Sequence, residues 1–576
     1  MADPMLLTDS RRLTGPNLYW QRAGAVLDVT VTDADAPRAL QAWEESARSI
    51  LDAIGWQAEA TRIRRFSGGA SLVISAPVDT LYAATDVNEW ALAAANEILT
   101  GAPAPDLEHG AALLRHLIDT ESHPALLTMR QAAASHGVNF LVDEQIASVG
   151  SGAGCRSWTV DQVPAPSTVD WNQVHDVPTV LVTGSNGKTT TVRLLTAELT
   201  AAGRAVGMCC SDTVIVAGDV LERGDWSGPG GARMVLRDPR VEVAVLETAR
   251  GGMLRRGLAV ERADAAIITN IAEDHFGEFG ISDLAALTEA KLIVARALGR
   301  SGRLVLNADD PELVASVPQL DVPLSWFAME AGNAVLRAHI AAGGEAATVV
   351  DDRFVLVRDR ELHLIAAVAD VPITLAGAAR HNVANVLGVI ALAAALGLDP
   401  ATIARGLTRF RGSAADNPGR LNLFEFGGVT AVVDFAHNPH GMNALVALAE
   451  KLPGKRRLIL MGQAGDRDDS AIREFVRSAW GFRPDRIVLK EMEHYRRGRA
   501  HGEVTAIMEA EFRQLGAPRE SIDHAASEYA AVIEALTWAQ PGDLLLLPLH
   551  SEREQSLALL DRLQTGHWIP GQPLPA

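Results

Sequence analysis

The stretch Leu181–Thr190, LVTGSNGKTT, places two glycines, a lysine and two threonines in one short segment. Glycines let backbone N–H groups close around an anion, and a helix that begins there points its positive end at the same anion. A standard Walker loop has another glycine five places before its Gly-Lys pair, where Val182 stands here. We therefore predict a variant phosphate-binding loop. Its residues are Gly184, Ser185, Asn186, Gly187, Lys188, Thr189 and Thr190.

The side chains of this loop suit a nucleotide with bound metal. Lys188 offers a point charge to the terminal phosphates of ATP, and Thr189 offers a hydroxyl to Mg²⁺. The alternative is a glycine turn with a surface lysine. An apolar run precedes the loop and a helical pattern follows it over residues 189–203, which favours phosphate binding.

Two more metal-ligand candidates follow apolar runs that we expect to be strands. Glu247 ends the run 242–247, and His275, beside Asp274, follows the run 265–270. Ligands bind at the carboxyl ends of parallel strands, where a carboxylate or a neutral imidazole can hold a cation. We predict that Glu247 and His275 bind metal. The alternative for the histidine is a structural role.

Three stretches of the chain differ in their sequence pattern, and each predicts a domain that helps to position these residues. The first 170 residues mix alternating strands with helical stretches, which predicts a small α+β domain. Residues 171–411 alternate continuous apolar runs with helices, which predicts a central parallel-sheet ATPase domain. Residues 412–576 repeat that alternation on a smaller scale, which predicts a Rossmann-like C-terminal domain. The fold class is therefore α/β with three domains.

Composition narrows the classes of function. The chain has 576 residues and a net charge of −19, and an acidic surface repels nucleic acid and anionic lipid. Three cysteines form no disulfide framework and no zinc-binding spacing. The first residues lack a signal-peptide pattern, and no apolar run is long enough to span a bilayer. We expect a cytoplasmic protein without nucleic-acid or membrane partners.

Six motifs, in this order, resemble the Mur ligase family: TGSNGKTT, TNIAEDH, NADDP, HNVAN, NPGR and DFAHNP. Those enzymes form amide bonds with ATP. More narrowly, VLETARGGMLRRGL and KEMEHYRRGRAHGE resemble the Mur-ligase-like half of the cyanophycin synthetases, and LTGPNLYW resembles their N-terminal domain. The resemblance covers about 400 residues from Pro178 onward, and more weakly the first 170.

The resemblance implies a role for each matching residue. Lys188 and Thr189 hold phosphates and Mg²⁺, and Glu247 and His275 bind metal. Lys291, 16 residues after the histidine, matches a carbamylated lysine that supports a second Mg²⁺. The alternative for Lys291 is an exposed helix lysine. Four further matches complete the nucleotide site: Asn382 and Asn385 near adenine, Arg420 at the γ-phosphate and Asp434 at the ribose.

One part of the cyanophycin synthetase pattern is missing. Those proteins carry an ATP-grasp domain between their N-terminal and Mur-ligase-like parts, and here only about 45 residues stand in that place. They resemble only its opening segment. We therefore expect one ATP site and no backbone polymerisation by this chain.

The expected function is an ADP-forming acid–amino acid ligase, which joins an amino acid, arginine or another basic one, to a peptide-like acceptor carboxylate. The alternative is a non-catalytic nucleotide-binding scaffold or partner subunit of a cyanophycin-type synthetase, and a homo-oligomer is compatible with either. Candidate residues for binding the amino acid lie in two charged stretches: Asp466, Arg467, Asp468, Arg497, Arg499 and Glu503. The alternative for them is a solvated charged surface.

Overall fold

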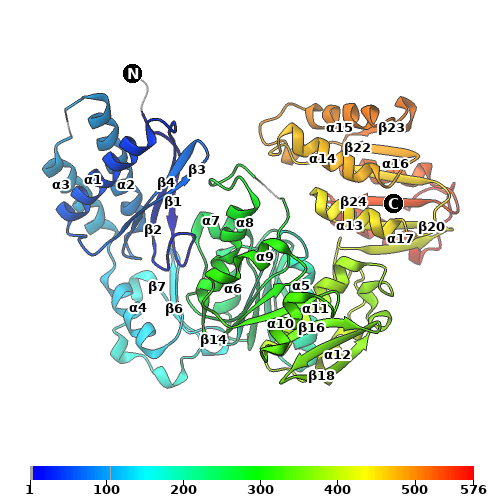
Figure 1. Ribbon diagram of the computed structural model, residues 1–576, viewed down its shortest axis with the longest axis horizontal. Helices are drawn as coiled ribbons and strands as arrows, with labels where there is room; N and C mark the ends of the chain where they lie inside the picture. The colour runs from blue at the N-terminus through cyan, green and yellow to red at the C-terminus, as the bar shows by residue number, and fades with distance from the viewer. Residues whose placement is uncertain (1–3, 104, 274–275, 576) are drawn as a thin grey trace.

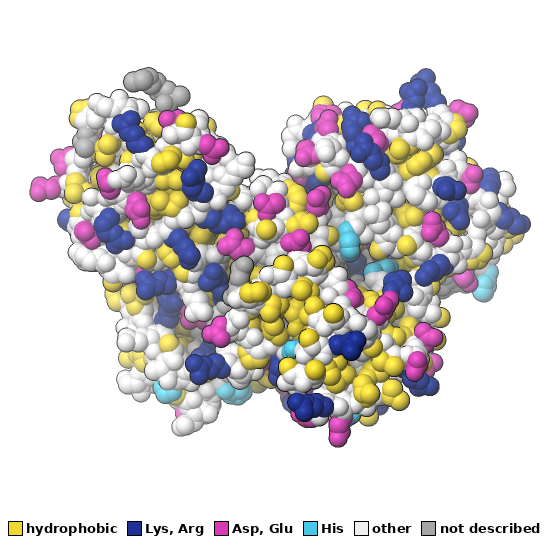
Figure 2. All heavy atoms as spheres, in the orientation of Figure 1, with side chains coloured by type: hydrophobic (Ala, Val, Ile, Leu, Met, Phe, Trp, Pro, Cys, Tyr) yellow, Lys and Arg dark blue, Asp and Glu magenta, His cyan; other side chains and the backbone are white. Residues whose placement is uncertain are grey.

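The computed structural model describes residues 4–103, 105–273 and 276–575, and within them the chain forms four β-sheets (Figure 1). The N-terminal and C-terminal sheets stand at opposite ends of a central part that carries the largest sheet. In the space-filling view these two ends form separate lobes with a hollow between them (Figure 2). Over the described ranges, no helix has the length and apolar character needed to cross a bilayer.

The N-terminal sheet is antiparallel, with the strand order β1-β2-β4-β3. Its elements are β1 (Leu6–Leu13), β2 (Gly24–Thr30), α1 (Ala36–Ile54), β3 (Thr61–Phe66), β4 (Gly69–Ser75), α2 (Leu81–Thr100) and α3 (Leu107–Glu121). Leu27 and Leu72 face these helices, whereas Val26 and Val73 on the other side pack against the central part. This arrangement confirms the predicted α+β unit, and it fixes that unit to its neighbour.

A second small sheet follows in the segment that we interpreted as the ATP-grasp remnant. Helix α4 (Pro124–His136) precedes the antiparallel strands β5 (Phe140–Val142), β6 (Ile146–Val149) and β7 (Arg156–Thr159). Helix α4 and these strands share the core of the N-terminal sheet. The predicted boundary at residues 170–171 lies after β7, and it stays a prediction.

The central sheet has eleven strands in the order β11-β10-β9-β12-β8-β13-β14-β15-β16-β17-β18. They are β8 (Thr179–Thr183), β9 (Val206–Cys209), β10 (Thr213–Val216), β11 (Asp219–Arg223), β12 (Val243–Glu247), β13 (Ala263–Ile268), β14 (Leu298–Asn307), β15 (Leu324–Ala328), β16 (Ala346–Val350), β17 (Arg353–Arg358) and β18 (Glu361–Ala367). Strands β9 to β16 of this order pair in parallel, which confirms the predicted parallel sheet. The two strands at each edge pair antiparallel, which the sequence analysis did not predict.

Helices cover both faces of the central sheet, because its strands are apolar on both sides. Val180 and Val182 contribute to one core, while Leu181 between them contributes to the other. The first core includes α5 (Lys188–Ala201), α11 (Arg380–Ala395) and α12 (Pro400–Arg409). The second includes α6 (Pro229–Arg237), α7 (Arg250–Arg256), α8 (Leu284–Lys291), α9 (Pro311–Ser316) and α10 (Ala334–Ala341).

The C-terminal sheet has six strands in the order β19-β20-β24-β21-β22-β23, parallel except for the β19–β20 hairpin. They are β19 (Asn422–Phe426), β20 (Val429–Asp434), β21 (Arg457–Met461), β22 (Arg486–Lys490), β23 (Ile522–Ala525) and β24 (Leu544–Pro548). Its helices are α13 (Pro439–Ala449), α14 (Asp469–Trp480), α15 (Glu503–Gln514), α16 (Glu528–Trp538) and α17 (Arg553–Thr565). The first three cover one face and the last two the other, which confirms the Rossmann-like α/β arrangement.

Candidate active site

The predicted phosphate loop lies between β8 and α5. Gly184 and Gly187 have φ angles of 144° and 84°, a region of backbone conformation that favours glycine. A Cβ atom on Gly184 would lie 1.9 Å from the Thr269 hydroxyl, and one on Gly187 would lie 2.3 Å from Asn385 Oδ1. Lys188 Nζ donates hydrogen bonds to the carbonyl oxygens of Gly184 and Ser185, at 3.0 and 3.1 Å. The loop therefore needs both glycines, and its lysine lies over them.

Two hydroxyls and one carboxylate meet at the start of α5. Thr189 Oγ1 donates to Glu247 Oε2 at 2.9 Å and lies 3.0 Å from Ser211 Oγ. The Ser211 backbone N–H also donates to Glu247 Oε2, at 3.3 Å. Burial raises the pKa of Glu247, although Lys188 opposes that effect. Three hard oxygen donors in contact are a set that suits Mg²⁺.

The two remaining predicted metal ligands are His275 and Lys291. His275, with Asp274, lies outside the described residues. Lys291 ends α8 and is only 2% exposed, so the alternative of an exposed helix lysine is wrong. Its role at a second Mg²⁺ stays a proposal.

Two arginines of the C-terminal part reach this region, Arg420 at the oxygen group itself and Arg553 at the neighbouring Asp212. Arg420 Nη2 donates to Ser211 Oγ at 3.1 Å and to Thr189 Oγ1 at 3.4 Å. Arg553, the first residue of α17, donates to Asp212 Oδ1 at 2.6 Å. Burial opposes the charge on Asp212, but Arg420, Arg553 and Arg193 outweigh burial and hold its pKa below the usual range.

Three arginines gather around one aspartate at this point, and Glu247 and Asp434 also interact with Arg420. Asp212 is the one carboxylate that Arg193, Arg420 and Arg553 share, at 3.7, 3.8 and 2.6 Å. In the described part of the structure, Arg420 Nη1 is buried and has no hydrogen-bond partner. A buried donor without a partner is costly, so an anion such as a phosphate would suit it. The residues present therefore fit ATP with Mg²⁺.

Asn186 of the phosphate loop also makes hydrogen bonds to the C-terminal part and to the neighbouring strand end. Asn438 Nδ2 donates to Asn186 Oδ1 at 3.1 Å, and Asn186 Nδ2 lies 3.0 Å from His440 Nδ1. The Asn186 backbone N–H donates to Asn270 Oδ1 at 3.0 Å. Asn417 of the C-terminal part also contacts the loop, because its Nδ2 donates to Thr190 Oγ1 at 3.3 Å. The phosphate loop thus contacts both neighbouring strands and the C-terminal part.

The residues predicted to contact adenine and ribose have structural partners. Asn385 Nδ2 donates to Asn382 Oδ1 at 3.1 Å, and Asn382 Nδ2 donates to the Ile373 carbonyl at 3.0 Å. Asp434 Oδ2 accepts from the backbone N–H of Leu421 at 2.9 Å, and burial raises the pKa of this carboxyl although Arg420 opposes it. Asn385 therefore supports Gly187, and Asp434 holds the segment that carries Arg420. Direct nucleotide contacts by these residues stay proposals.

The candidates for amino-acid binding lie in the loops after β21 and β22. Arg499 donates to the carbonyls of Gly465 and Arg467 at 3.0 and 2.6 Å, and to Glu503 at 2.8 Å. Asp468 caps α14 by accepting from Ala471 N at 2.8 Å. Arg499, Glu503 and Asp468 therefore hold these loops together. The partners of Asp466 and Arg467 include each other, at 3.8 Å, and Arg497 lies 5.9 Å from the Tyr495 ring centre.

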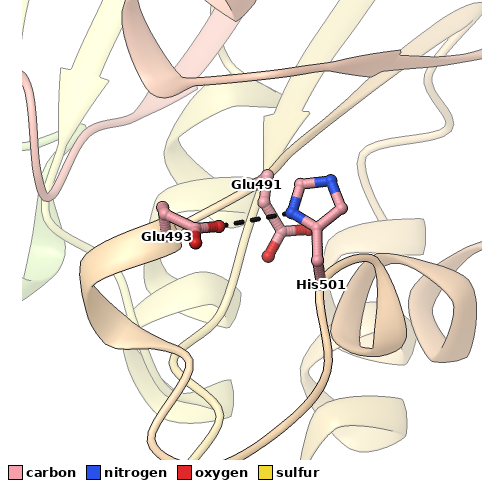
Figure 3. A group of neighbouring side chains, drawn as sticks. All are labelled: Glu491, Glu493 and His501. Atoms are coloured by element: carbon pink, nitrogen blue, oxygen red, sulfur yellow. Dashed lines mark hydrogen bonds and ion pairs between the residues drawn. The ribbon is translucent and has the colours of Figure 1, made fainter.

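An acidic group that the sequence analysis missed lies beside these loops. The ligand atoms of Glu491, Glu493 and His501 are all within 4.8 Å of one another. Figure 3 shows the Glu493 carboxylate and the His501 ring pointing toward each other, 3.2 Å apart, with Glu491 beside them. Glu491 is 8% exposed and accepts from the Gly502 backbone N–H at 3.1 Å. The group can bind a cation.

Comparison with protein families agrees with this geometry. Residues 182–393 match the Mur ligase middle domain, and residues 419–548 match the Mur ligase glutamate ligase domain. The chain belongs to the Mur ligase family.

Individual relatives show which members of the family this chain is similar to in sequence. The chain is 38% identical over 333 residues to the cyanophycin synthetase of Crocosphaera subtropica, covering 58% of this chain and 38% of that protein. It is 39% identical over 334 residues to the cyanophycin synthetase of Synechocystis sp., with the same two shares. It is 29% identical over 286 residues to UDP-N-acetylmuramate–L-alanine ligase of Xanthomonas oryzae pv. oryzae, covering 49% and 54%. The chain therefore spans about two fifths of the length of the cyanophycin synthetases that it matches.

Several site residues were missed by sequence reasoning: Arg193, Ser211, Asp212, Asn270, Asn417, Asn438 and Arg553. Asn270, Asn417 and Asn438 stand inside three of the six family motifs, but no role was assigned to them. Arg193, Ser211, Asp212 and Arg553 are common residue types outside those motifs and give no distinctive pattern. Lysine is different, because only five of the 52 basic residues are lysine. Three of those five are Lys188 in the phosphate loop and the buried Lys291 and Lys490. The rarity of lysine is a signal that could have drawn attention to Lys490.

Proposed function

We propose that this chain is an ATP-dependent ligase that activates an acceptor carboxylate as an acyl phosphate and joins it to the amine of an amino acid, releasing ADP and phosphate. One observation carries the proposal. Arg420 of the C-terminal part bonds to Ser211 and Thr189, beside Glu247, so a single phosphate site contains groups from two sheets. Such a site is complete only when the two parts are closed, which suits a reaction that must exclude water.

The roles of the residues follow from their chemistry. The backbone of Gly184–Gly187 and the Lys188 ammonium would bind the β- and γ-phosphates, and Arg420 and Arg553 would neutralise charge on the transferred phosphoryl group. Thr189, Glu247 and Ser211 would hold Mg²⁺, which supplies Lewis-acid stabilisation of phosphate oxygens when bound. The acceptor carboxylate attacks phosphorus and ADP leaves; the amine then attacks the acyl carbon and phosphate leaves. These groups mainly orient and neutralise, which phosphoryl transfer requires.

The amine that we propose is a basic amino acid. The group Glu491, Glu493 and His501 lies at the carboxyl end of β22, where ligands of parallel sheets bind. Glu493 already pairs with Arg496 at 2.7 Å, so the Glu491 carboxylate is the main source of negative charge for a ligand. A guanidinium or an ammonium group would pair with these carboxylates. Glu491→Gln and Glu493→Gln should raise the KM for the amino acid and leave the KM for ATP unchanged. Glu509→Gln serves as the control, because Glu509 is a carboxylate of helix α15 in the same part of the chain and it pairs with His524.

The direct test is a substrate screen. Purified protein is incubated with ATP, Mg²⁺ and pools of amino acids and short peptides, and ADP release is followed together with product masses. A product heavier by one amino-acid residue supports the ligase. Tight ATP binding without any product from these pools favours the second candidate, a nucleotide-binding scaffold.

A further inference from the structure

Three ionisable side chains meet inside the C-terminal part, away from the phosphate loop. They are Lys490 at the end of β22, Glu528 at the start of α16 and His550 after β24. Their side chains are 0%, 0% and 7% exposed, and Lys490 forms an ion pair with Glu528. A buried ion pair of this kind contributes little net stability compared with apolar residues of similar size. Stability alone therefore does not account for these three residue types.

The hydrogen bonds of the group define its protonation. Lys490 Nζ contacts Glu528, the Pro548 carbonyl at 2.6 Å and His550 Nδ1 at 3.1 Å, which uses all three of its protons. His550 Nε2 lies 3.1 Å from the Ala436 carbonyl, which can only accept. His550 is therefore neutral with its proton on Nε2. Burial lowers its pKa well below the usual range, and Lys490 adds to that effect.

The first consequence concerns Arg420. The Phe435 ring packs edge-on against His550, with ring centres 4.9 Å apart, and the Arg420 guanidinium lies 4.0 Å from the centre of the same ring. The bond from His550 to the Ala436 carbonyl fixes the turn that carries Phe435. His550 thus supports the surface on which Arg420 rests while Arg420 reaches Thr189 and Ser211.

The second consequence concerns Arg553. The Glu528 carboxylate accepts from the backbone N–H groups of His550 and Glu552, at 2.6 and 2.8 Å. These bonds hold the turn that leads directly into α17, where Arg553 meets Asp212. One buried group therefore contacts both of the turns that present the two arginines.

We propose that Lys490, Glu528 and His550 form a positioning network that holds Arg420 and Arg553 against Ser211 and Asp212. These three residues touch neither nucleotide nor substrate. The proposal rests on the proposed function in one respect, namely that the two arginines bind the phosphates of ATP. It explains why a chain that rarely uses lysine keeps one in a fully buried position.

The test uses the full chain and a non-hydrolysable ATP analogue with Mg²⁺, and it measures affinity by calorimetry. His550→Phe keeps a ring against Phe435, but it removes the hydrogen bond to the Ala436 carbonyl and one of the three hydrogen bonds of Lys490. We expect this variant to bind the analogue about tenfold more weakly, as the loss of a buried hydrogen bond implies. His550→Gln retains an N–H donor for Ala436 and should stay within about threefold of the unmodified protein.

Two controls separate positioning from general destabilisation. Met508→Ala removes a buried side chain of α15 in the same part, and it should lower the melting temperature without changing the affinity. In a double-mutant cycle, His550→Phe should cause no further loss once Arg420→Met has removed the arginine. Unchanged affinity in His550→Phe, independent losses in the double variant, or an equal loss in Met508→Ala would each overturn the proposal. Because the readout is binding, a protein that shows the coupling but makes no product contradicts only the ligase assignment.

Discussion

The Arg420 guanidinium and the Ser211 hydroxyl lie 3.1 Å apart, although 209 residues separate them and they extend from different sheets. Thr189 lies within hydrogen-bond distance of both. This contact joins the oxygens of the central part that we propose to bind Mg²⁺ to the cationic groups of the C-terminal part. A change on either side of the contact is therefore expected to affect the same chemical step.

Lys188→Ala should lower the rate of ADP formation by about 10²–10³-fold, as the removal of one preorganised electrostatic group does in other enzymes. The lysine already rests on the loop that would cradle the phosphates. Steady-state release of ADP measures the effect. Lys455→Ala, at an exposed lysine, is the control. Ligation by Lys188→Ala at the unmodified rate would contradict the assignment of the loop.

Arg553→Met should reduce kcat/KM for ATP by about tenfold or more, because its bond to Asp212 is shielded from solvent. The side chains of Arg553 and Asp212 are 14% and 6% exposed. Arg223 and Glu554 form a matched pair across the same two parts, but their side chains are 70% and 76% exposed. Arg223→Met should therefore change kcat/KM by less than about twofold. Equal effects of the two substitutions would argue against a phosphate role for Arg553.

Lys291→Ala should lower turnover sharply, and bicarbonate or a short carboxylate should restore part of it. A carbamate is an oxygen anion, so a small added anion can replace it at a metal. Turnover is measured with and without formate, acetate and bicarbonate. The same additions to Lys188→Ala should restore nothing. If Lys291→Ala has full activity, or if none of the three anions rescues it, the carbamate is not present.

Glu198→Met should stabilise the protein at neutral and alkaline pH. Glu198 is fully buried, neither of its carboxyl oxygens has a hydrogen-bond partner in the described structure, and burial raises its pKa well above the usual range. The unfolded chain loses this proton near pH 4.3 but the folded chain retains it to higher pH, so Glu198 makes stability fall as pH rises above about 4.3.

Melting temperatures between pH 5 and pH 8 measure that prediction. The substitution should remove part of the decline and add about 1–3 kcal/mol at the upper end, which is the usual cost of a buried polar group without a partner. Glu450→Met, at an exposed glutamate, should leave the pH dependence unchanged. An unaltered slope in Glu198→Met would show that the carboxyl finds a partner in solution.

The product should be a single addition to each acceptor carboxylate. Only one phosphate loop is present in the sequence, and one activating site couples one class of carboxylate to one class of amine. Mass spectra of reactions with excess ATP and amino acid test this expectation. A ladder of growing chains made by this protein alone would contradict it, because alternating backbone and side-chain bonds need a second activating site.

Local pattern predicted most of the fold. Continuous apolar runs such as those of β8, β12 and β13 identified the parallel sheet, and the glycines located the loop between β8 and α5. The antiparallel strands at both edges were missed; the outermost ones, β11 and β18, have no buried residue and one buried residue, respectively, so neither has the buried apolar run of a central parallel strand. Their pairing is decided by neighbours and not by their own composition.

Within the candidate site, residues that lie in recognisable motifs could be predicted, and residues outside them could not. Thr189, Glu247 and Arg420 lie in recognisable motifs, and the structure brings these three together. Ser211, Asp212 and Arg553 have no motif of their own, since their importance comes from a contact across two sheets. Arg499 and Glu503 were interpreted as ligand candidates from charge alone, but their hydrogen bonds join two loops. Charge in a sequence does not reveal which partner it will meet.

The segment that supplies Arg420 and Arg553 also carries the acidic group Glu491, Glu493 and His501. Under the proposed function, exchange of this segment between relatives by recombination would transfer the preference for the amine and the completion of the phosphate site together. A chimera with the C-terminal half of a relative would then be active only where Ser211, Asp212 and Asn186 of the recipient chain still pair with the arginines and the asparagine of the new half. Under the proposed function, a change of amine specificity by this route would therefore depend on these few positions in the recipient half.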